Sequence, residues 1–283
     1  MKISTNKIII GTAQMSRNYG VTNFQKYEKR KKIKILEFAW DSGIRSFDTA
    51  PYYGNAEKIL GEFIKINNLK DEIKIYTKID IQNYKKNFID NINFSVSKSL
   101  KVLKVDKLEC VYVSNNFCIN NIDNKIISNI KKNLNVKKVG ASIYNDVKKI
   151  SLIRKKFDLF QVPINIALKN NYNYLKEQKI IARSIFLQGL LLNKKVSHKI
   201  PRRLQLSLNK YFNFLKKIEM TPLEISLSFI NDLKKIPNFI IGIDKKLQLK
   251  KILNTDVKKL NKDHCSAIIN LFNISDLDPR KWE

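Results

Sequence analysis

The chain has 283 residues, with 54 Lys and Arg against 25 Asp and Glu, a formal net charge of +29, and 43% hydrophobic residues. This length suits a single α/β barrel, which runs to roughly 250 residues, and the apolar content is enough for a large core. Because no glycine-, serine- or proline-rich linker divides the sequence, we expect one domain over residues 1–283.

The positive charge has two interpretations. A basic surface can bind nucleic acid or anionic lipid. Alternatively, Lys, Asn and Ile are enriched throughout the chain, and the scattered lysines, with no arginine-rich cluster, favour this second interpretation. We therefore expect no specific nucleic-acid partner. A nucleic-acid-binding barrel stays an alternative that rests on charge alone, and salt-sensitive, non-specific DNA binding is compatible with both interpretations.

The cysteines and the apolar runs bear on the location of the protein. Cys110, Cys118 and Cys265 show no paired metal-ligand spacing, so we expect reduced thiols in a cytoplasmic protein and no metal. The beginning of the chain, MKISTNKIIIGTAQ, has only a short isoleucine run, whereas a secretory signal needs roughly 7–15 apolar residues. No window approaches the roughly 20 apolar residues of a spanning helix, so we expect no membrane association.

Short β-rich segments alternate with helical segments along the whole chain. Strands are predicted at 7–13, 44–49, 73–79, 108–113, 136–142, 159–164, 179–184 and 239–243. Apolar spacing near 3.6 predicts helices, among them 32–42, 56–66, 87–103 and 221–233. This alternation indicates parallel pairing with right-handed crossovers, and eight such units predict a closed (β/α)8 TIM barrel. The absence of a glycine-rich strand-to-helix turn disfavours an open dinucleotide-binding sheet.

Polar residues stand where the predicted strands end, which is where barrel enzymes place their chemistry. In chain order they are Thr12, Gln14, Asp48, Tyr53, Lys78, Ser114, Ser142, Gln161, Asn165, Ser184, Gln188, Gly242 and Asp244.

Asp48, Tyr53 and Lys78 follow neighbouring strands and form a chemically coherent set. A phenol has a pKa near 10 and is a poor acid at neutral pH. A nearby ammonium such as that of Lys78 favours the phenolate, and Asp48 can keep that ammonium protonated and oriented. The three residues would protonate an oxygen that gains negative charge, as a carbonyl does when it accepts hydride. The alternative is that Asp48 caps a turn and Tyr53 packs in the loop.

The motifs resemble those of the aldo-keto reductase superfamily, in its bacterial branch. The stretch FDTAPYYGNAE followed by YTK is similar to the family signature, and IIIGTAQMSRNYG, KKVGASIYN, FQVPINI, ARSIFLQGLLL and LDPRKW resemble further family segments in the same order. The resemblance covers nearly the whole chain. It implies a carbonyl–alcohol oxidoreductase that holds NADP(H), with Tyr53 as proton donor and Lys78 and Asp48 tuning it.

The resemblance also implies a cofactor site along the strand ends. Ser142 and Gln161 match residues expected to hold the carboxamide, and Gly242 and Lys245 match the phosphate end. The presence of Lys245 and Lys246 favours NADP(H) over NAD(H), which stays an alternative. The residues expected to bind cofactor are Gly11, Thr12, Ser142, Gln161, Arg183, Ser184, Gln188, Gly242, Lys245 and Gln248.

The sequence departs from the family pattern at the end of the fourth strand, where a histidine is usual and Ser114 stands. A serine donates one hydrogen bond but cannot carry positive charge. The enzyme is then slow, or Ser114 positions a different substrate, or the barrel is a catalytically impaired nucleotide-binding redox sensor that acts through a protein partner. The two histidines, His198 and His264, fall elsewhere.

Two further positions leave alternatives open. Arg183 stands where many relatives carry a tyrosine that stacks on the nicotinamide, and its guanidinium either takes over the stacking or turns outward to an acid. Tyr19, Tyr52 and Phe117 either wall a pocket for a small carbonyl or sugar-like substrate or pack loops against the rim. The sequence does not define the oligomeric state.

Overall fold

A computed structural model shows a closed barrel of eight parallel strands in sequence order, the TIM-barrel fold predicted from the strand–helix alternation. The structure describes residues 1–15, 28–80, 87–114, 116–144, 150–168, 179–193, 200–234 and 236–282, with the side chains of 116–118 excepted. The strands are β1 (Ile8–Gly11), β2 (Ser46–Asp48), β3 (Lys74–Lys78), β4 (Cys110–Val113), β5 (Val139–Ser142), β6 (Leu159–Pro163), β7 (Ile180–Arg183) and β8 (Asn238–Gly242). The strands β1 to β7 lie inside their predicted segments, and β8 begins one residue before the predicted segment 239–243.

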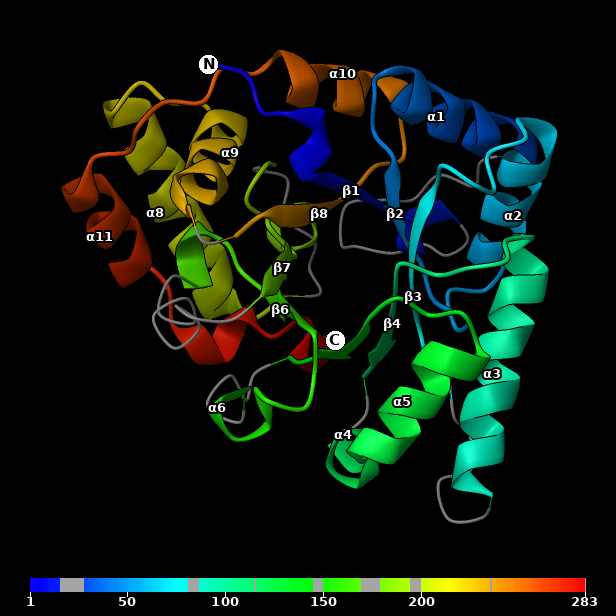
Figure 1. Ribbon diagram of the computed structural model, residues 1–283. Helices are drawn as coiled ribbons and strands as arrows, with labels where there is room; N and C mark the ends of the chain where they lie inside the picture. The colour runs from blue at the N-terminus through cyan, green and yellow to red at the C-terminus, as the bar shows by residue number, and fades with distance from the viewer. Residues whose placement is uncertain are drawn as a thin grey trace.

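Helices surround the strands, as Figure 1 shows. They are α1 (Lys29–Asp41), α2 (Ala56–Ile66), α3 (Phe88–Leu103), α4 (Asn116–Asn121), α5 (Asn124–Asn133), α6 (Ile150–Ile153), α8 (Arg202–Lys217), α9 (Pro222–Asp232), α10 (Lys246–Asn254) and α11 (Lys262–Asn270). Local sequence explains several boundaries. Thr221 and Glu224 form a capping box at α9, with Pro222 at the first helical position.

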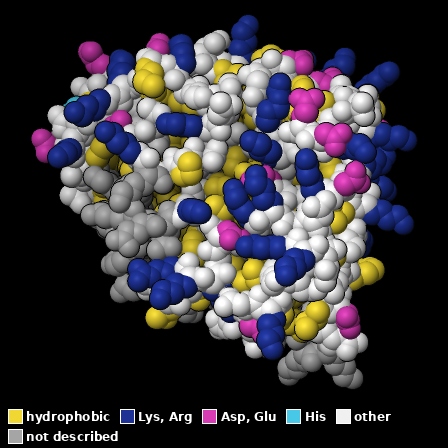
Figure 2. Space-filling model, in the orientation of Figure 1, with side chains coloured by type: hydrophobic (Ala, Val, Ile, Leu, Met, Phe, Trp, Pro, Cys, Tyr) yellow, Lys and Arg dark blue, Asp and Glu magenta, His cyan; other side chains and the backbone are white. Residues whose placement is uncertain are grey.

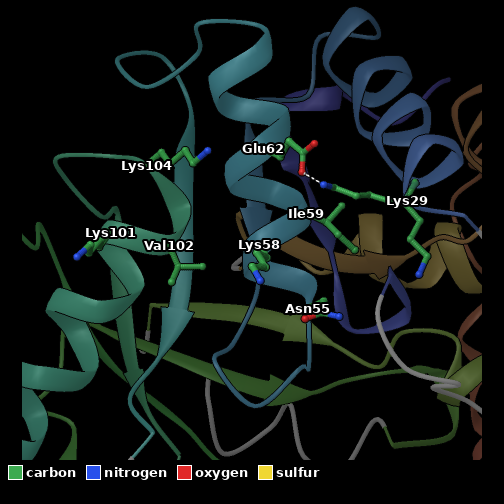
Figure 3. Close-up of a pocket in the computed structure, with 9 residues that line it drawn as sticks. Lys29, Asn55, Lys58, Ile59, Glu62, Lys101, Val102 and Lys104 are labelled. Carbon is green, nitrogen blue, oxygen red and sulfur yellow. Dashed lines mark ion pairs between the residues drawn. The ribbon is translucent and has the colours of Figure 1, made fainter.

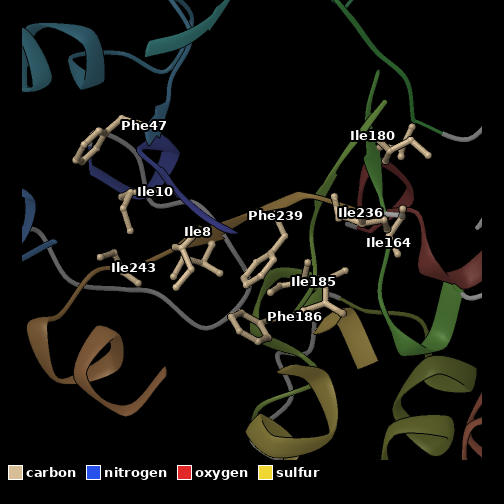
Figure 4. Close-up of a cluster of buried hydrophobic side chains, with 14 of the residues drawn as sticks. Ile8, Ile10, Phe47, Ile164, Ile180, Ile185, Phe186, Ile236, Phe239 and Ile243 are labelled. Carbon is tan, nitrogen blue, oxygen red and sulfur yellow. The ribbon is translucent and has the colours of Figure 1, made fainter. Parts of the chain in front are cut away.

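The large core lies between the strands and the helices. Because side chains alternate along a strand, Ile8 and Ile10 of β1 and Phe47 of β2 face outward and are fully buried under the helices. Figure 4 shows part of this layer, with Phe239 of β8 and Ile180 of β7 in it. In α1 the most buried side chains are those of Leu36 and Ala39, and Phe38 is only partly buried.

A second, smaller cluster is made by side chains of the alternate strand positions, which point into the barrel. Its members are Ile9, Tyr76, Cys110, Tyr112, Leu159 and Ile181. Gly140 makes room for it, because a Cβ at this position would lie 2.6 Å from the ring of Tyr112. The same inward alternation brings the last inward residue of each strand to the carboxyl-terminal mouth of the barrel, where the candidate site lies.

Register aligns these strand ends. Gly11 pairs with Asp48 on one side and with Gly242 on the other. Lys78 pairs with Tyr112, and Ser142 pairs with Gln161. The polar residues that the sequence placed at strand ends are therefore neighbours around one rim.

Candidate active site at the barrel mouth

The centre of the mouth holds a buried ion pair between β2 and β3. The Lys78 ammonium donates to Asp48 Oδ1 at 2.9 Å and to the Thr49 carbonyl oxygen at 2.9 Å. Both side chains of the pair are about 95% buried. Lys78 Nζ also lies 4.9 Å from the centroid of the Tyr53 ring. The structure thus brings together the three residues that the sequence grouped.

Opposing effects set the protonation of this group. Burial acts to lower the pKa of Lys78, but the Asp48 carboxylate together with the hydroxyls of Tyr53 and Tyr52 outweighs burial, so the net pKa is raised and the ammonium stays charged. Burial raises the pKa of Tyr53, and the charge of Lys78 lowers it by less. The net direction for Tyr53 is upward, which corrects the expectation of a phenol made more acidic overall. The sequence identified the ammonium but not the stronger effect of desolvation.

Gln161 joins this group from the opposite side of the barrel. Its Nε2 donates to Asp48 Oδ2 at 2.7 Å, and its Oε1 accepts from the Ser142 hydroxyl at 3.3 Å. Gln161 is 1% exposed. A continuous polar chain therefore runs from β5 through β6 to the Asp48–Lys78 pair. The sequence placed Ser142 and Gln161 together, as found, but did not foresee the link to Asp48.

The end of β4 carries Ser114 beside Tyr52. The Tyr52 hydroxyl donates to Ser114 Oγ at 3.5 Å, and the Tyr52 ring meets the Tyr53 ring edge-on at 5.3 Å between centroids. Of the two histidines, His264 belongs to α11 and packs against Phe214, whereas His198 lies outside the described residues. The predicted substrate residues Tyr19 and Phe117 also fall outside what the structure describes, Phe117 by its side chain.

Arg183 packs against the ring of Tyr144, a contact that neither of the two predictions included. Its guanidinium lies 4.1 Å from the centroid of the Tyr144 ring and donates to the Ile143 carbonyl and the Ser184 hydroxyl. Arg280, from the end of the chain, lies 4.2 Å from the centroid of the same ring. Cation–π contacts of this kind hold the C-terminal segment against the mouth, and no motif in the sequence pointed to Tyr144.

The backbone turns sharply after β7. Ser184 and Gln188 both have a φ of 55°, in the left-handed region. The buried Asn165 holds the turn by donating from Nδ2 to the Ser184 carbonyl oxygen at 3.1 Å. On the far side of the mouth, Thr12 donates through both its amide and its hydroxyl to the Asp48 carbonyl oxygen. Both segments therefore fix the rim around Asp48.

The ends of β1 and β8 enclose buried oxygens that lack partners. Within the described part of the chain, Gln14 Oε1 and Asp244 Oδ1 accept no hydrogen bond, and neither does Thr49 Oγ1. Gln14 lies over Gly242, in space that a Cβ there would fill. Unpaired buried acceptors are costly, so this corner fits a ligand that brings hydroxyl or amide donors. Sequence reasoning named Gln14 and Asp244 as strand-end residues without giving them a role.

The start of α10 limits what Gln248 can offer. Its Oε1 accepts from the backbone amides of Asp244 and Lys245, at 2.9 and 3.3 Å. This is a helix cap, so at least this oxygen is not free for the adenine contact that the sequence suggested. Lys245 is the N-cap residue of α10 and is exposed, beside Gly242. An anion at this helix start would meet the positive end of the helix dipole.

Other kinds of site find no support in the described residues. They contain no cluster of three or more His, Cys, Asp and Glu side chains that could hold a metal ion. None of the helices that the structure describes is both long and apolar enough to cross a bilayer.

Comparison with known sequences gives one family. The model of the aldo/keto reductase family matches residues 7–271. The chain is 39% identical over 74 residues to a D-threo-aldose 1-dehydrogenase from a Pseudomonas species, covering 24% of this chain and 22% of that protein. It is 28% identical over 120 residues to a D-arabinose 1-dehydrogenase from Saccharomyces cerevisiae, covering 39% and 33%. These matches span about a fifth to a third of the relatives' lengths.

Comparison with solved structures agrees on the fold. A glycerol dehydrogenase from Gluconobacter oxydans superposes with a TM-score of 0.69 at 16% identity, over 94% of this chain and 90% of that one. A Pseudomonas aeruginosa protein provisionally assigned as an aldo-keto reductase gives 0.65 at 18% identity, over 87% and 88%. At such identities the likeness shows the shared barrel alone.

Proposed function

Because the chain belongs to the aldo/keto reductase family, we propose that it is a nicotinamide-dependent oxidoreductase that interconverts a carbonyl and its alcohol. The observation that carries the proposal is the buried Asp48–Lys78 pair beside Tyr53 at the barrel mouth. A charged pair this deeply buried is costly unless it is well bonded. The cost is understandable if the pair works on the phenol next to it.

In this mechanism Tyr53 gives its proton to the carbonyl oxygen as negative charge develops there. The nicotinamide cofactor, when bound, supplies the hydride for reduction and accepts it for oxidation. The raised pKa keeps the Tyr53 phenol protonated at neutral pH. Lys78 stabilises the charge left on the phenol oxygen, and Asp48 fixes the position of the Lys78 ammonium. The reverse proton transfer serves alcohol oxidation.

Gln161 is proposed as the residue that connects cofactor binding to this proton donor. Its side-chain amide bonds to Asp48 Oδ2 and to the Ser142 hydroxyl. Gln161 and Ser142 are the two residues that the family resemblance assigns to the nicotinamide carboxamide. The orientation of the carboxylate and the placement of the nicotinamide would then depend on one side chain. Arg183 would cover the nicotinamide with the face of its guanidinium that Tyr144 leaves open.

The remaining cofactor contacts are assigned to the rim. Gln14 Oε1 and Asp244 Oδ1 would accept from sugar hydroxyls, since both are buried and lack donors. Gly242 and Lys245 would meet the phosphates, with NADP(H) favoured by the exposed lysine and NAD(H) as the alternative. Gly11, Thr12, Ser184 and Gln188 would shape the backbone of the site, and Gln248 would hold the start of α10.

The proposed substrate is a polar carbonyl compound of the aldose type. Tyr52 presents a ring and a hydroxyl at the mouth, next to the Ser114 hydroxyl, which suits a polyhydroxylated ligand. Two of the relatives are named for aldoses. Ser114, with no imidazole beside it among the described residues, predicts slower turnover than a histidine would give, because one positioned proton-transfer group is worth about 10²–10⁴ in rate.

The Ser114 position also favours a second candidate, a catalytically impaired nucleotide-binding redox sensor. The test is a steady-state assay of NADPH and NADH oxidation with a panel of aldoses and simple aldehydes, for the native protein and Tyr53→Phe. The proposed function predicts turnover that Tyr53→Phe removes while NADPH still binds. Cofactor binding without turnover in the native protein would instead support the sensor.

A further inference from the structure

A hollow on the outside of the barrel lies between α1, α2 and α3, and none of the residues assigned to the barrel mouth lines it. It has a volume of about 520 Å³. Figure 3 shows Lys29 reaching in from α1 to Glu62 of α2, Lys58 farther along α2, and Lys104 after α3 with its ammonium toward α2, whereas the ammonium of Lys101 points away from α2. The residues that line it are Lys29, Lys32, Asn55, Lys58, Ile59, Glu62, Lys101, Val102 and Lys104.

The charge of this hollow exceeds what a lysine-rich chain gives by chance. Lysine and arginine make up 54 of 283 residues, about one in five, whereas five of the nine lining residues are lysines. The only lining carboxylate is that of Glu62, and it forms an ion pair with Lys29. No carboxylate in the described part of the chain pairs with the other four lysines. Elsewhere, Figure 2 shows the basic side chains spread over the visible face.

The packing of α3 on α2 brings these lysines together. Gly61 of α2 allows the close approach, because a Cβ there would collide with the Val102 carbonyl oxygen. The chain then leaves α3 through Lys104, which has a φ of 58°, a conformation usually taken by glycine or asparagine. A lysine at this position adds a cation to the wall of the hollow, where glycine or asparagine would fit the backbone better.

The surroundings of Lys32 make the hollow suited to an anion. The start of α2, through Asn55, and the last turn of α3, through Lys101 and Val102, both line the hollow, so the opposite ends of two helix dipoles offset each other there and the lysines set its charge. Burial lowers the pKa of Lys32, and no carboxylate in the described residues counteracts this. A bound anion would offset both the repulsion among the ammonium groups and the partial loss of water around Lys32.

The walls exclude other classes of ligand. The apolar lining is limited to Ile59 and Val102, with no aromatic ring on which a base or a sugar could stack. Recognition would therefore rest on charge. We propose that this hollow binds a compact anion carrying several phosphate groups, such as a short polyphosphate, at a site separate from the barrel mouth.

Isothermal titration of the full chain with inorganic tripolyphosphate tests the proposal. The probe variant is K58Q/K104Q, and the matched control K210Q/K217Q removes two exposed lysines of α8 on another side of the barrel. We expect about tenfold weaker binding for the probe variant and less than twofold for the control, because only the probe changes the hollow. Orthophosphate should bind the native chain at least tenfold more weakly than tripolyphosphate.

Three results would overturn the proposal. Equal weakening in both double variants would show general charge attraction only. Orthophosphate binding as tightly as tripolyphosphate would show that several phosphates are not needed. Loss of binding in Lys245→Gln, with none in K58Q/K104Q, would place the anion at the barrel mouth. None of these readouts depends on carbonyl reduction, so they stand apart from the proposed enzymatic activity.

Discussion

Two sets of lysines in this protein show how burial changes the role of one residue type. Lys78 is almost fully buried and donates to a carboxylate and a carbonyl oxygen. Lys58 and Lys104 are exposed and have no carboxylate partner in the described residues. A buried ammonium must be bonded where it stands and so holds its neighbours in place, whereas exposed ones are free to meet a ligand. Lys78 therefore contributes by holding Asp48 and Tyr53 in position, whereas the lysines of the hollow contribute by attracting an anion.

The largest effect is expected from a substitution of the buried lysine, Lys78. Lys78→Met leaves the Asp48 carboxylate buried without its cation, so we expect the free energy of unfolding to fall by about 3–5 kcal/mol and turnover to be lost. Cofactor affinity should stay within about tenfold of the native value, because Lys78 is not a phosphate anchor. Denaturant unfolding and cofactor titration measure both quantities.

The control for this prediction is Lys58→Met, the same change at an exposed lysine. Its free energy of unfolding should stay within about 0.5 kcal/mol of the native value, as is usual for surface substitutions. If Lys78→Met and Lys58→Met lower the free energy of unfolding equally, the buried Asp48–Lys78 pair does not hold its neighbours in place as described above.

A second prediction concerns the serine at the end of β4. Ser114→His should raise the rate of aldehyde reduction about tenfold, because it restores a proton-carrying and orienting group next to Tyr52. Steady-state kinetics with model aldehydes measure this, with Ser114→Ala as the control that removes the hydroxyl alone. Unchanged or lower activity in Ser114→His would count against the placement of Ser114 in the catalytic machinery.

A smaller loss of activity is expected from substitutions of Gln161 and Ser142, which connect β6 and β5 to Asp48. Gln161→Leu removes the donor to Asp48 Oδ2, and leaving a buried acceptor unpaired costs about 1–3 kcal/mol. We expect kcat/KM to fall about tenfold with a shifted pH profile. Ser142→Ala keeps the bond to Asp48 and leaves only the neutral Gln161 Oε1 without its donor, so it should lower kcat/KM by less than Gln161→Leu does. A larger fall in kcat/KM for Ser142→Ala than for Gln161→Leu would contradict the connecting role of Gln161.

The sequence was sufficient to predict the parts of the site that depend on local pattern. Strand ends can be predicted from the alternation of residues and from strand length. Asp48 and Lys78 are the last residues of β2 and β3, and Gln161 lies two residues before the end of β6. Gln248 could also have been recognised, because a glutamine at the third position of a helix is typical of a capping interaction. The family resemblance led instead to a cofactor role for it.

The parts that the sequence did not predict depend on contacts between distant segments. The Gln161–Asp48 bond joins residues 113 positions apart, and the Arg280–Tyr144 contact joins the end of the chain to the loop after β5. The upward pKa of Tyr53 arises from burial, which no local motif encodes. The lysine hollow depends on the approach of α3 to Gly61, which only packing reveals.

The measurement that tests the central claim most directly is a crystal structure of the protein with NADPH bound. The account predicts the Tyr53 hydroxyl within about 2.6–3.2 Å of Lys78 Nζ, facing the nicotinamide across the strand ends. A dinucleotide bound away from the mouth, or a Tyr53 hydroxyl turned from both Lys78 and the nicotinamide, would contradict it.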